Sequence, residues 1–260
     1  MSARLDGRGA VVTGGGRGIG AEVARALAGS GVRVVVAART SKEIEQVTAE
    51  LRAGGSEAWP VRCDVADESS VRELGQKARA CLGAVDILVN NAGTGSSAPL
   101  GKITLEEWNR TMAANATGVF LCTREFVPGM IQSRWGRVVN VASVAGLSGA
   151  KYVAHYSAAK HAVIGFTRSV ALELEGTGVS VHAVCPGYVD TPMTERTVAN
   201  VQSRTGLTHD QALAAVLATT GQERLLRPGE VAAAVVDLCR DDAGLESGRI
   251  LVLGAGVPTP

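Results

Sequence analysis

The stretch GAVVTGGGRGIGAEVARALAGSG, residues 9–31, decides the fold of this chain. It begins with a short β-branched run at 9–13, passes through the glycine-rich GGGRGIG at 14–20, and continues with apolar residues at helical spacing. The pattern predicts a strand, a tight turn and an amphipathic helix in succession. Such a turn brings backbone N–H groups and a helix N-terminus to one point, where a pyrophosphate can bind. A glycine turn kept only for its backbone conformation is the alternative.

The rest of the chain alternates between apolar runs and segments with helical periodicity. Further strands are expected at 32–38, 57–65, 85–93, 136–143, 179–187 and 249–256. Helices are expected at 42–53, 67–82, 155–175 and 228–238, and as two helices or one bent helix over 104–130, which opens like a capping box at Thr104 and Glu107. This alternation predicts an α/β fold of the Rossmann type, a doubly wound parallel sheet of about seven strands with helices on both faces.

Composition narrows the class of protein. The chain has 260 residues and is 46% hydrophobic, which suits one α/β domain over residues 1–260. A formal charge of +1 with scattered basic residues argues against nucleic acid or an anionic membrane surface as partner. No apolar run reaches transmembrane length and the N-terminus lacks the pattern of a secretion signal, so we expect a cytoplasmic protein.

The cysteines and histidines do not indicate a metal site or disulfides. Five cysteines are far apart and never in C-x-x-C spacing, which is typical of free buried thiols. His155 and His161 fall on different faces of one predicted helix, and no H-E-x-x-H occurs.

Polar or glycine residues follow the predicted strands at their carboxyl ends. In an open α/β sheet, ligands bind outside these ends. The carboxyl ends of six predicted strands are therefore expected to border one crevice. They carry the glycine turn, Ala38-Arg39, Asp64, residues 90–93, Ser143 and Pro186-Gly187.

The segment SVAGLSGAKYVAHYSAAK, residues 143–160, can carry proton chemistry. Tyr156 and Lys160 are four apart, so on a helix their side chains share a face. A nearby ammonium favours the phenolate and is expected to bring the tyrosine pKa from about 10 toward working pH. Ser143 would be a neutral hydrogen-bond donor beside them. A half-buried aromatic residue and a snorkelling lysine are the simpler alternative.

At this point the chain resembles the short-chain dehydrogenase/reductase family, and in particular the 3-oxoacyl and polyketide ketoreductases. The resemblance covers nearly the whole chain and rests on TGGGRGIG (13–20), NNAG (90–93), Asn115 in AANATG, Ser143, YSAAK (156–160), and Pro186-Gly187 with Thr191. It implies an oxidoreductase that transfers hydride between NADP(H) and a carbonyl or secondary alcohol, most often by reducing a 3-oxoacyl or other ketone substrate.

The resemblance also implies a catalytic set of Asn115, Ser143, Tyr156 and Lys160. Tyr156 would exchange a proton with the substrate oxygen and Ser143 would hydrogen-bond that oxygen. Lys160 would lower the tyrosine pKa and hold the nicotinamide ribose. Asn115 would fix a water that links Lys160 to solvent, although an amide that caps a helix break would fit its spacing equally well.

Cofactor contacts are implied for residues at every strand end that borders the crevice. They are Gly14, Gly16, Arg17, Gly18, Ile19, Gly20, Arg39, Asp64, Val65, Asn91, Ala92, Gly93, Tyr156, Lys160, Pro186, Gly187, Val189 and Thr191.

The choice of dinucleotide depends on the end of the second strand. An acidic residue there would accept bonds from a ribose 2′-hydroxyl, but this chain has Ala38. Arg39 and Arg17 instead favour the 2′-phosphate of NADP(H) over NAD(H), because arginine pairs well with phosphate. An arginine stacked on adenine is the alternative.

Substrate contacts are expected from the loop at 94–102, from 144–153 and from the segment at 190–226, and the first two are small and apolar. No buried arginine is obvious to bind a carboxylate, so a ketone or acyl thioester is favoured over a free keto acid. The polar segment at about 190–226 is similar to the substrate lid of 3-hydroxybutyrate dehydrogenases and aromatic polyketide ketoreductases. The acid-binding histidine and lysine of the former are Ala145 and Val153 here.

Partners are implied only by the resemblance. Of the arginines with which 3-oxoacyl reductases dock an acyl carrier protein, one matches Arg134, but the other position is Thr177. Family members are usually homotetramers, although Leu253 departs from the usual V-D-G-G near the C-terminus. An NAD-dependent secondary-alcohol (hydroxyacyl) dehydrogenase and a non-enzymatic dinucleotide-binding protein remain as alternatives.

Overall fold

The computed structural model of the chain describes residues 5–240 and 246–254. Their strands form one seven-stranded parallel sheet in the order β3-β2-β1-β4-β5-β6-β7, so the strand order reverses between β1 and β4. The strands are β1 (Gly9–Thr13), β2 (Arg33–Ala38), β3 (Ala58–Arg62), β4 (Ile87–Asn90), β5 (Gly136–Val141), β6 (Val179–Pro186) and β7 (Ile250–Leu253). The predicted doubly wound sheet is confirmed.

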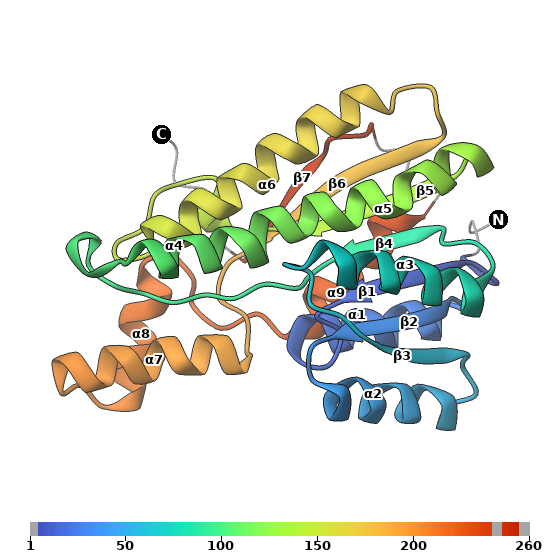
Figure 1. Cartoon of the computed structure of the whole chain (residues 1–260). Helices are drawn as coiled ribbons and strands as arrows, with labels where there is room; N and C mark the ends of the chain where they lie inside the picture. The colour runs from blue at the N-terminus through green and yellow to red at the C-terminus, as the bar shows by residue number, and fades with distance from the viewer. Residues whose placement is uncertain (1–4, 241–245, 255–260) are drawn as a thin grey trace.

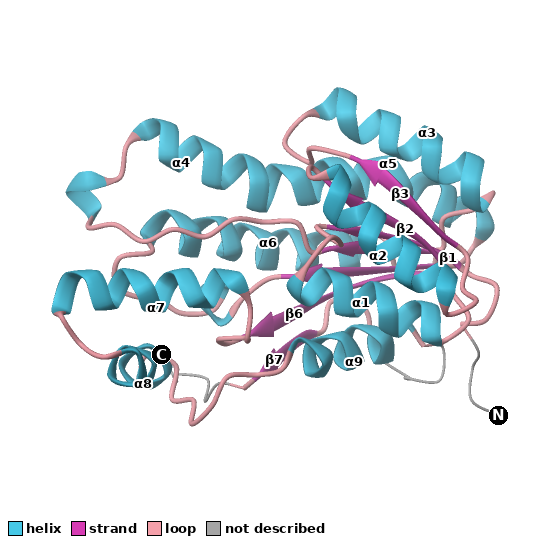
Figure 2. Ribbon diagram, turned by 90° about the horizontal axis from the view of Figure 1, so that it is seen from below, coloured by secondary structure: helices cyan, strands magenta, loops and turns pink. Residues whose placement is uncertain are grey.

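Helices cover both faces of this sheet (Figure 1, Figure 2). One apolar cluster joins the sheet to α1 (Gly18–Gly29), α2 (Ser41–Ala53) and α9 (Pro228–Cys239), and a second joins the other face to α3 (Glu68–Leu82) and α5 (Gly118–Ser133). The valines of β2 alternate between them, with Val34 and Val36 in the first and Val35 in the second. A strand buried on both faces therefore needs apolar residues at every position, as the sequence of β2 shows.

The predicted break within 104–130 is a change of helix type. The helix begins as α4 (Leu105–Met112), widens into a π-helical stretch η2 (Ala113–Thr117) and continues as α5. Thr104 caps α4 by accepting a hydrogen bond from the Glu107 backbone N–H. The reciprocal half of the predicted capping box is wrong, because the Glu107 carboxylate binds the side chains of Ser96 and Arg110 instead.

Several predicted boundaries were too generous. Asp64 lies beyond the end of β3, and predicted strand residues 255–256 fall outside the described part of the chain. The helix that carries Tyr156 and Lys160, α6, runs from Ala154 to Glu173, and a short turn η3 (Val144–Gly146) follows β5.

The segment predicted as a lid contains α7 (Pro192–Thr205) and α8 (His209–Ala218). These two helices share a small apolar cluster of their own, built on Val198, Ala212 and Val216. Both views place them beyond the carboxyl ends of the strands (Figure 1, Figure 2). Their position allows them to cover a ligand at that edge of the sheet.

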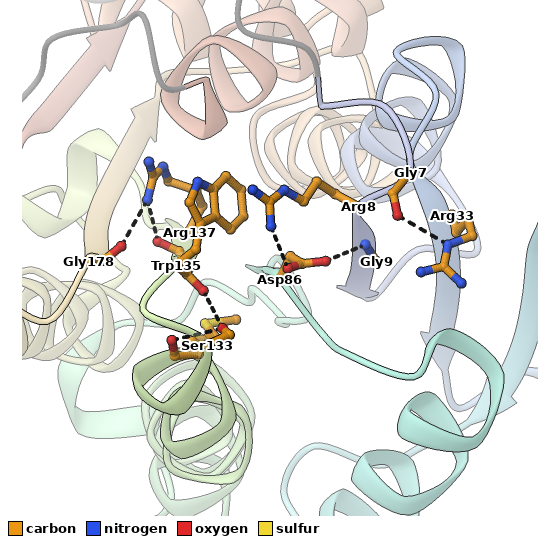
Figure 3. A network of polar contacts seen from close by, with 11 residues as sticks. Gly7, Arg8, Gly9, Arg33, Asp86, Ser133, Trp135, Arg137 and Gly178 are labelled. Atoms are coloured by element: carbon orange, nitrogen blue, oxygen red, sulfur yellow. Dashed lines mark hydrogen bonds and ion pairs between the residues drawn. The ribbon is translucent and has the colours of Figure 1, made fainter.

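Polar contacts connect the segments that precede the strands, at the amino ends of the sheet (Figure 3). The Asp86 carboxylate accepts from the Arg8 guanidinium at 3.1 Å and from the Gly9 N–H at 2.8 Å. The guanidinium carbons of Arg8 and Arg137 lie 3.7 and 4.4 Å from the ring centroid of Trp135, a double cation–π arrangement. These contacts tie β1, β4 and β5 together at the edge opposite the predicted crevice.

Two further features bear on the class of protein. All five cysteines are free thiols, and four of them are buried. No helix in the described ranges is long and apolar enough to cross a bilayer.

Candidate functional site

A cavity of about 750 Å³ lies at the carboxyl ends of the strands. All the predicted site residues except Gly20 line it, from the glycine turn through Arg39, Asp64, Asn91, Ser143 and Tyr156 to Thr191. Gly20 packs against the glycine turn outside the cavity lining. Only a glycine fits there, because a Cβ on it would lie 2.3 Å from the Gly14 carbonyl oxygen. The structure therefore brings the predicted set together in one place.

The glycine turn is shaped for an anion. Gly14 and Gly18 have φ angles of +65° and +53°, which favour glycine. The first turn of α1 has no side-chain cap and no acidic residue, so its N–H groups and the positive end of the helix dipole face the cavity. These features fit the pyrophosphate of a dinucleotide.

Tyr156 and Lys160 lie one turn apart on α6, and Ser143 lies just beyond β5. The Lys160 ammonium nitrogen is 5.7 Å from the centroid of the Tyr156 ring. It donates a hydrogen bond of 2.9 Å to the Val141 carbonyl oxygen, and only 5% of the residue is exposed. The lysine is thus a buried donor at the floor of the cavity, and the snorkelling alternative is wrong.

Burial, and not the lysine charge, dominates the ionisation of this pair. Burial raises the pKa of Tyr156 to about 12, although a hydrogen bond with Ser143 opposes the shift. Burial lowers the pKa of Lys160 to about 8. The expectation that Lys160 brings the tyrosine pKa down is therefore wrong for this arrangement, because desolvation of the phenolate outweighs an ammonium that points at Val141.

Asn115 is fully buried in the π-helical stretch. Its side-chain N–H groups donate to the Thr111 and Thr94 carbonyl oxygens, both at 2.9 Å, and its carbonyl accepts from the Thr94 N–H at 3.3 Å. The amide therefore does what the helix-break alternative predicted, and it also anchors the chain after β4. A Cβ on Gly93 would lie 2.5 Å from the Asn115 oxygen and 3.8 Å from the Lys160 nitrogen, so only a glycine fits between them.

The region expected to hold a ribose phosphate contains a carboxylate that sequence analysis missed. Arg39 is exposed and lines the cavity, as predicted. Arg17, however, forms a 3.1 Å ion pair with Glu43 of α2, which also lines the cavity. β2 ends at Ala38 without a carboxylate, as predicted, but the Arg17 guanidinium is already paired with a carboxylate from α2. The only sequence signal was an acidic residue in the first turn of the helix that follows Arg39.

The substrate end of the cavity is bordered by three segments. They are 94–97 after β4, 144–150 after β5, and lid residues that include Met193 and Thr219. Ala145 and Val153 line it, as their positions predicted. Two exposed arginines, Arg110 and Arg196, also line it, and the sequence analysis did not identify them.

Comparison with known proteins identifies the family. A family model described as "short chain dehydrogenase" matches residues 8–202. The chain belongs to the short-chain dehydrogenase family. The resemblance of the motifs is thereby confirmed, and this protein is an oxidoreductase with a dinucleotide-binding fold.

Relatives within the family carry several activities in their names. The chain is 45% identical over 187 residues to a 3-oxoacyl-[acyl-carrier-protein] reductase of Synechocystis sp., covering 72% of this chain and 76% of the relative. It is 39% identical to cis-4-hydroxycyclohexanecarboxylate dehydrogenase of Sinomonas cyclohexanicum, covering 95% of each. A solved structure of a variant actinorhodin polyketide ketoreductase with NADPH superposes with a TM-score of 0.93 at 35% identity, covering 100% of both chains.

The burial of Lys160 gives a prediction about stability. Its pKa is about 8 in the folded protein against an ordinary value of 10.5, so the folded state binds fewer protons between these values. The free-energy cost of burying the charged Lys160 ammonium is fully present below pH 8 and declines as the pH rises toward 10.5. The free energy of unfolding of the wild type should therefore rise relative to that of Lys160→Met, by about 2 kcal/mol from pH 7.5 to 9.5.

Urea denaturation at the two pH values measures this difference. Lys151→Met removes an exposed lysine outside the cavity and controls for the general effect of losing a lysine. Parallel changes in the wild type and Lys160→Met would show that the ammonium is not desolvated.

Proposed function

We propose that this short-chain dehydrogenase reduces a ketone or 3-oxoacyl thioester with NADPH. The observation that carries the proposal is that Ser143, Tyr156 and Lys160 share one cavity with an anion-binding glycine turn. The chain would act as a single catalytic domain over residues 1–260, with α7 and α8 as the substrate lid at about 190–226.

The arrangement supports a division of labour among the side chains. When bound, the nicotinamide supplies hydride to the carbonyl carbon. Tyr156 donates its proton to the carbonyl oxygen, and its raised pKa of about 12 keeps that proton in place at neutral pH. Ser143 donates a hydrogen bond to the same oxygen and stabilises the developing charge.

The residues at the other end of the cavity would hold the cofactor. The N-terminus of α1 and the turn at Gly14–Gly20 would bind the pyrophosphate, and Asp64, Val65 and residues 91–93, which line the cavity, would border the adenosine. Lys160 would donate to the nicotinamide ribose, and Asn115 would support a proton path from Lys160 to solvent. Pro186, Gly187, Val189 and Thr191 also line the cavity and would lie on the carboxamide side of the nicotinamide.

We infer a preference for NADP(H) from Arg39 and Arg17. Guanidiniums bind a 2′-phosphate in charge-assisted pairs, and the superposed polyketide ketoreductase carries NADPH. Glu43 supports the second candidate, an NAD-dependent secondary-alcohol dehydrogenase, because its carboxylate already binds Arg17 and repels a phosphate. The two candidates differ in the affinity ratio of the cofactors.

Assembly as a homotetramer is also part of the proposal. Phe120 of α5 and Leu172 of α6 are 41% and 69% exposed on the outer surface of these helices. Burial of these two side chains against another subunit would remove apolar surface from water, and for this reason we include assembly in the proposal. We leave docking of an acyl carrier protein out of the proposal because Thr177 stands where the second docking arginine would be.

The catalytic role of Tyr156 has a direct test. Tyr156→Phe removes the proton donor and keeps the ring, so ketone reduction should fall about 10²- to 10⁴-fold. NADPH binding, followed by fluorescence, should change little. Tyr152→Phe removes a hydroxyl from a residue that is 58% exposed and should retain wild-type turnover. Near-wild-type turnover in Tyr156→Phe would refute the mechanism.

The cofactor preference has a second test. Arg39→Ala should weaken NADPH binding about 10- to 100-fold and leave NADH within about twofold, since only NADPH carries the phosphate. Fluorescence titration with both cofactors measures the ratio. Arg72→Ala removes an exposed arginine on α3 and is the control. An equal loss for both cofactors would favour adenine stacking by Arg39.

Glu43 gives a prediction of the opposite sign. Glu43→Gln frees the Arg17 guanidinium and removes a negative charge from the cavity. NADPH affinity should rise about threefold to tenfold, with NADH affinity nearly unchanged. Glu45→Gln makes the same change elsewhere on α2 and outside the cavity. If NADPH affinity fell, Glu43 would be a positioning residue for Arg17 and not a competitor.

A further inference from the structure

A hydrogen-bonded group of three side chains lies beside the proposed catalytic tyrosine, and none of the three belongs to the predicted catalytic and cofactor-binding residues. Ser96 belongs to the segment after β4, Glu107 to α4, and His155 to α6, immediately before Tyr156. The Ser96 hydroxyl contacts the Glu107 carboxylate, and its oxygen lies 2.8 Å from His155 Nε2. Three elements distant in sequence therefore meet at one hydroxyl.

The direction of these hydrogen bonds follows from the donors available. A carboxylate only accepts, so the single hydroxyl proton of Ser96 goes to Glu107. His155 must then donate its Nε2–H to the Ser96 oxygen. Its Nδ1 is buried without a hydrogen-bond partner among the described residues, which agrees with the donated proton being on Nε2.

Glu107 and His155 are held firmly at the ends of this chain of hydrogen bonds. Arg110 binds the second carboxylate oxygen of Glu107. Thr104 accepts from the Glu107 backbone N–H, which fixes the start of α4. His155 is 0% exposed and sits in the first turn of α6. Ser96 is thus the one member that belongs to a loop, and the other two restrain it.

That loop passes close to the proposed catalytic tyrosine and to the lid. Gly95 has no side chain, but a Cβ on it would lie 3.8 Å from Tyr156 Cε2 and 3.3 Å from the Met193 sulfur on α7. Thr94 is bound on both its N–H and its carbonyl by Asn115. The segment 94–97, here called the wall segment, therefore lies near both the tyrosine ring and the lid, and Asn115 and Ser96 anchor it on either side of Gly95.

We propose that His155, Ser96 and Glu107 position the wall segment against Tyr156, and so hold the substrate carbonyl in line with the phenol. The proposal rests on the proposed function for its effect on turnover. His155 and Glu107 act through Ser96 and need not touch the substrate. Small displacements of a reacting group reduce rates strongly, so a loosened wall should lower turnover without removing any catalytic group.

Kinetics of four variants test the proposal. His155→Leu and Ser96→Ala should each lower kcat/KM for a ketone about 10- to 100-fold, with NADPH affinity within about twofold of the wild type. The double variant should be no worse than the poorer single variant, because both break the same chain of hydrogen bonds. His155→Gln can place an N–H near Nε2 and should recover most of the activity.

His161→Gln is the matched control, since it changes an exposed histidine of the same helix. Unchanged kcat/KM in His155→Leu would overturn the proposal. So would a parallel loss of NADPH affinity and thermal stability, or failure of His155→Gln to recover activity, since these mark a general structural role.

A measurement independent of activity separates this proposal from the proposed function. The chain has three tyrosines, so ¹³C-labelled tyrosine gives few ring signals, and Tyr156→Phe assigns one of them. The Tyr156 signal should shift in His155→Leu and Ser96→Ala but not in His161→Gln. Absence of that shift overturns the positioning role. If the wild type reduced no ketone while the shift occurred, the proposed function would fail and the positioning of Tyr156 would stand.

Discussion

A buried threonine at the reversal of strand order holds the site together. Thr13 ends β1, is 1% exposed, and donates its hydroxyl to the Val89 carbonyl oxygen on β4 at 3.2 Å. The Thr13 hydroxyl oxygen accepts from the backbone N–H groups of Asn91 and Ala92, both at 3.1 Å. The Asn91 amide in turn binds the Thr13 and Gly14 carbonyls. The chain leaves β1 and β4 in different loops at this point. The hydrogen bonds of Thr13 and Asn91 therefore fix the width of the crevice between the two loops.

A second buried polar chain supports the floor of the site. The Asn90 amide donates to Thr123 of α5 and to Asn140 of β5, and Asn140 donates to Thr167 of α6. Each group is nearly inaccessible to water, so a missing partner would leave a buried donor unsatisfied. The helix that carries Tyr156 and Lys160 is therefore linked to β5 and to β4, the strand that leads into the wall segment.

Most of the fold and the membership of the site could be predicted from the sequence because both depend on local patterns. Short continuous apolar runs between helical segments predicted the strands, and parallel strands present their carboxyl ends on the same side of the sheet. Glu43 escaped notice because its meeting with Arg17 depends on how α2 packs, and not on spacing. The Tyr156 pKa was misjudged because charge can be inferred from i, i+4 spacing, whereas desolvation depends on the whole surrounding fold. Glu107 was assigned to a capping box because its competing partners, Ser96 and Arg110, meet it only in three dimensions.

The π-helical stretch η2 holds one residue more than an α-helix would need to connect α4 and α5 in the same orientation, because π-helical bonds run from residue i to i+5. The extra residue is accommodated where Asn115 lies, beside Gly93 and under the segment after β4. Deleting one residue from 113–117 would therefore leave α4 and α5 nearly in register but would remove the widened turn that places this amide. The helix could be repaired to an ordinary α-helix only at the expense of the site.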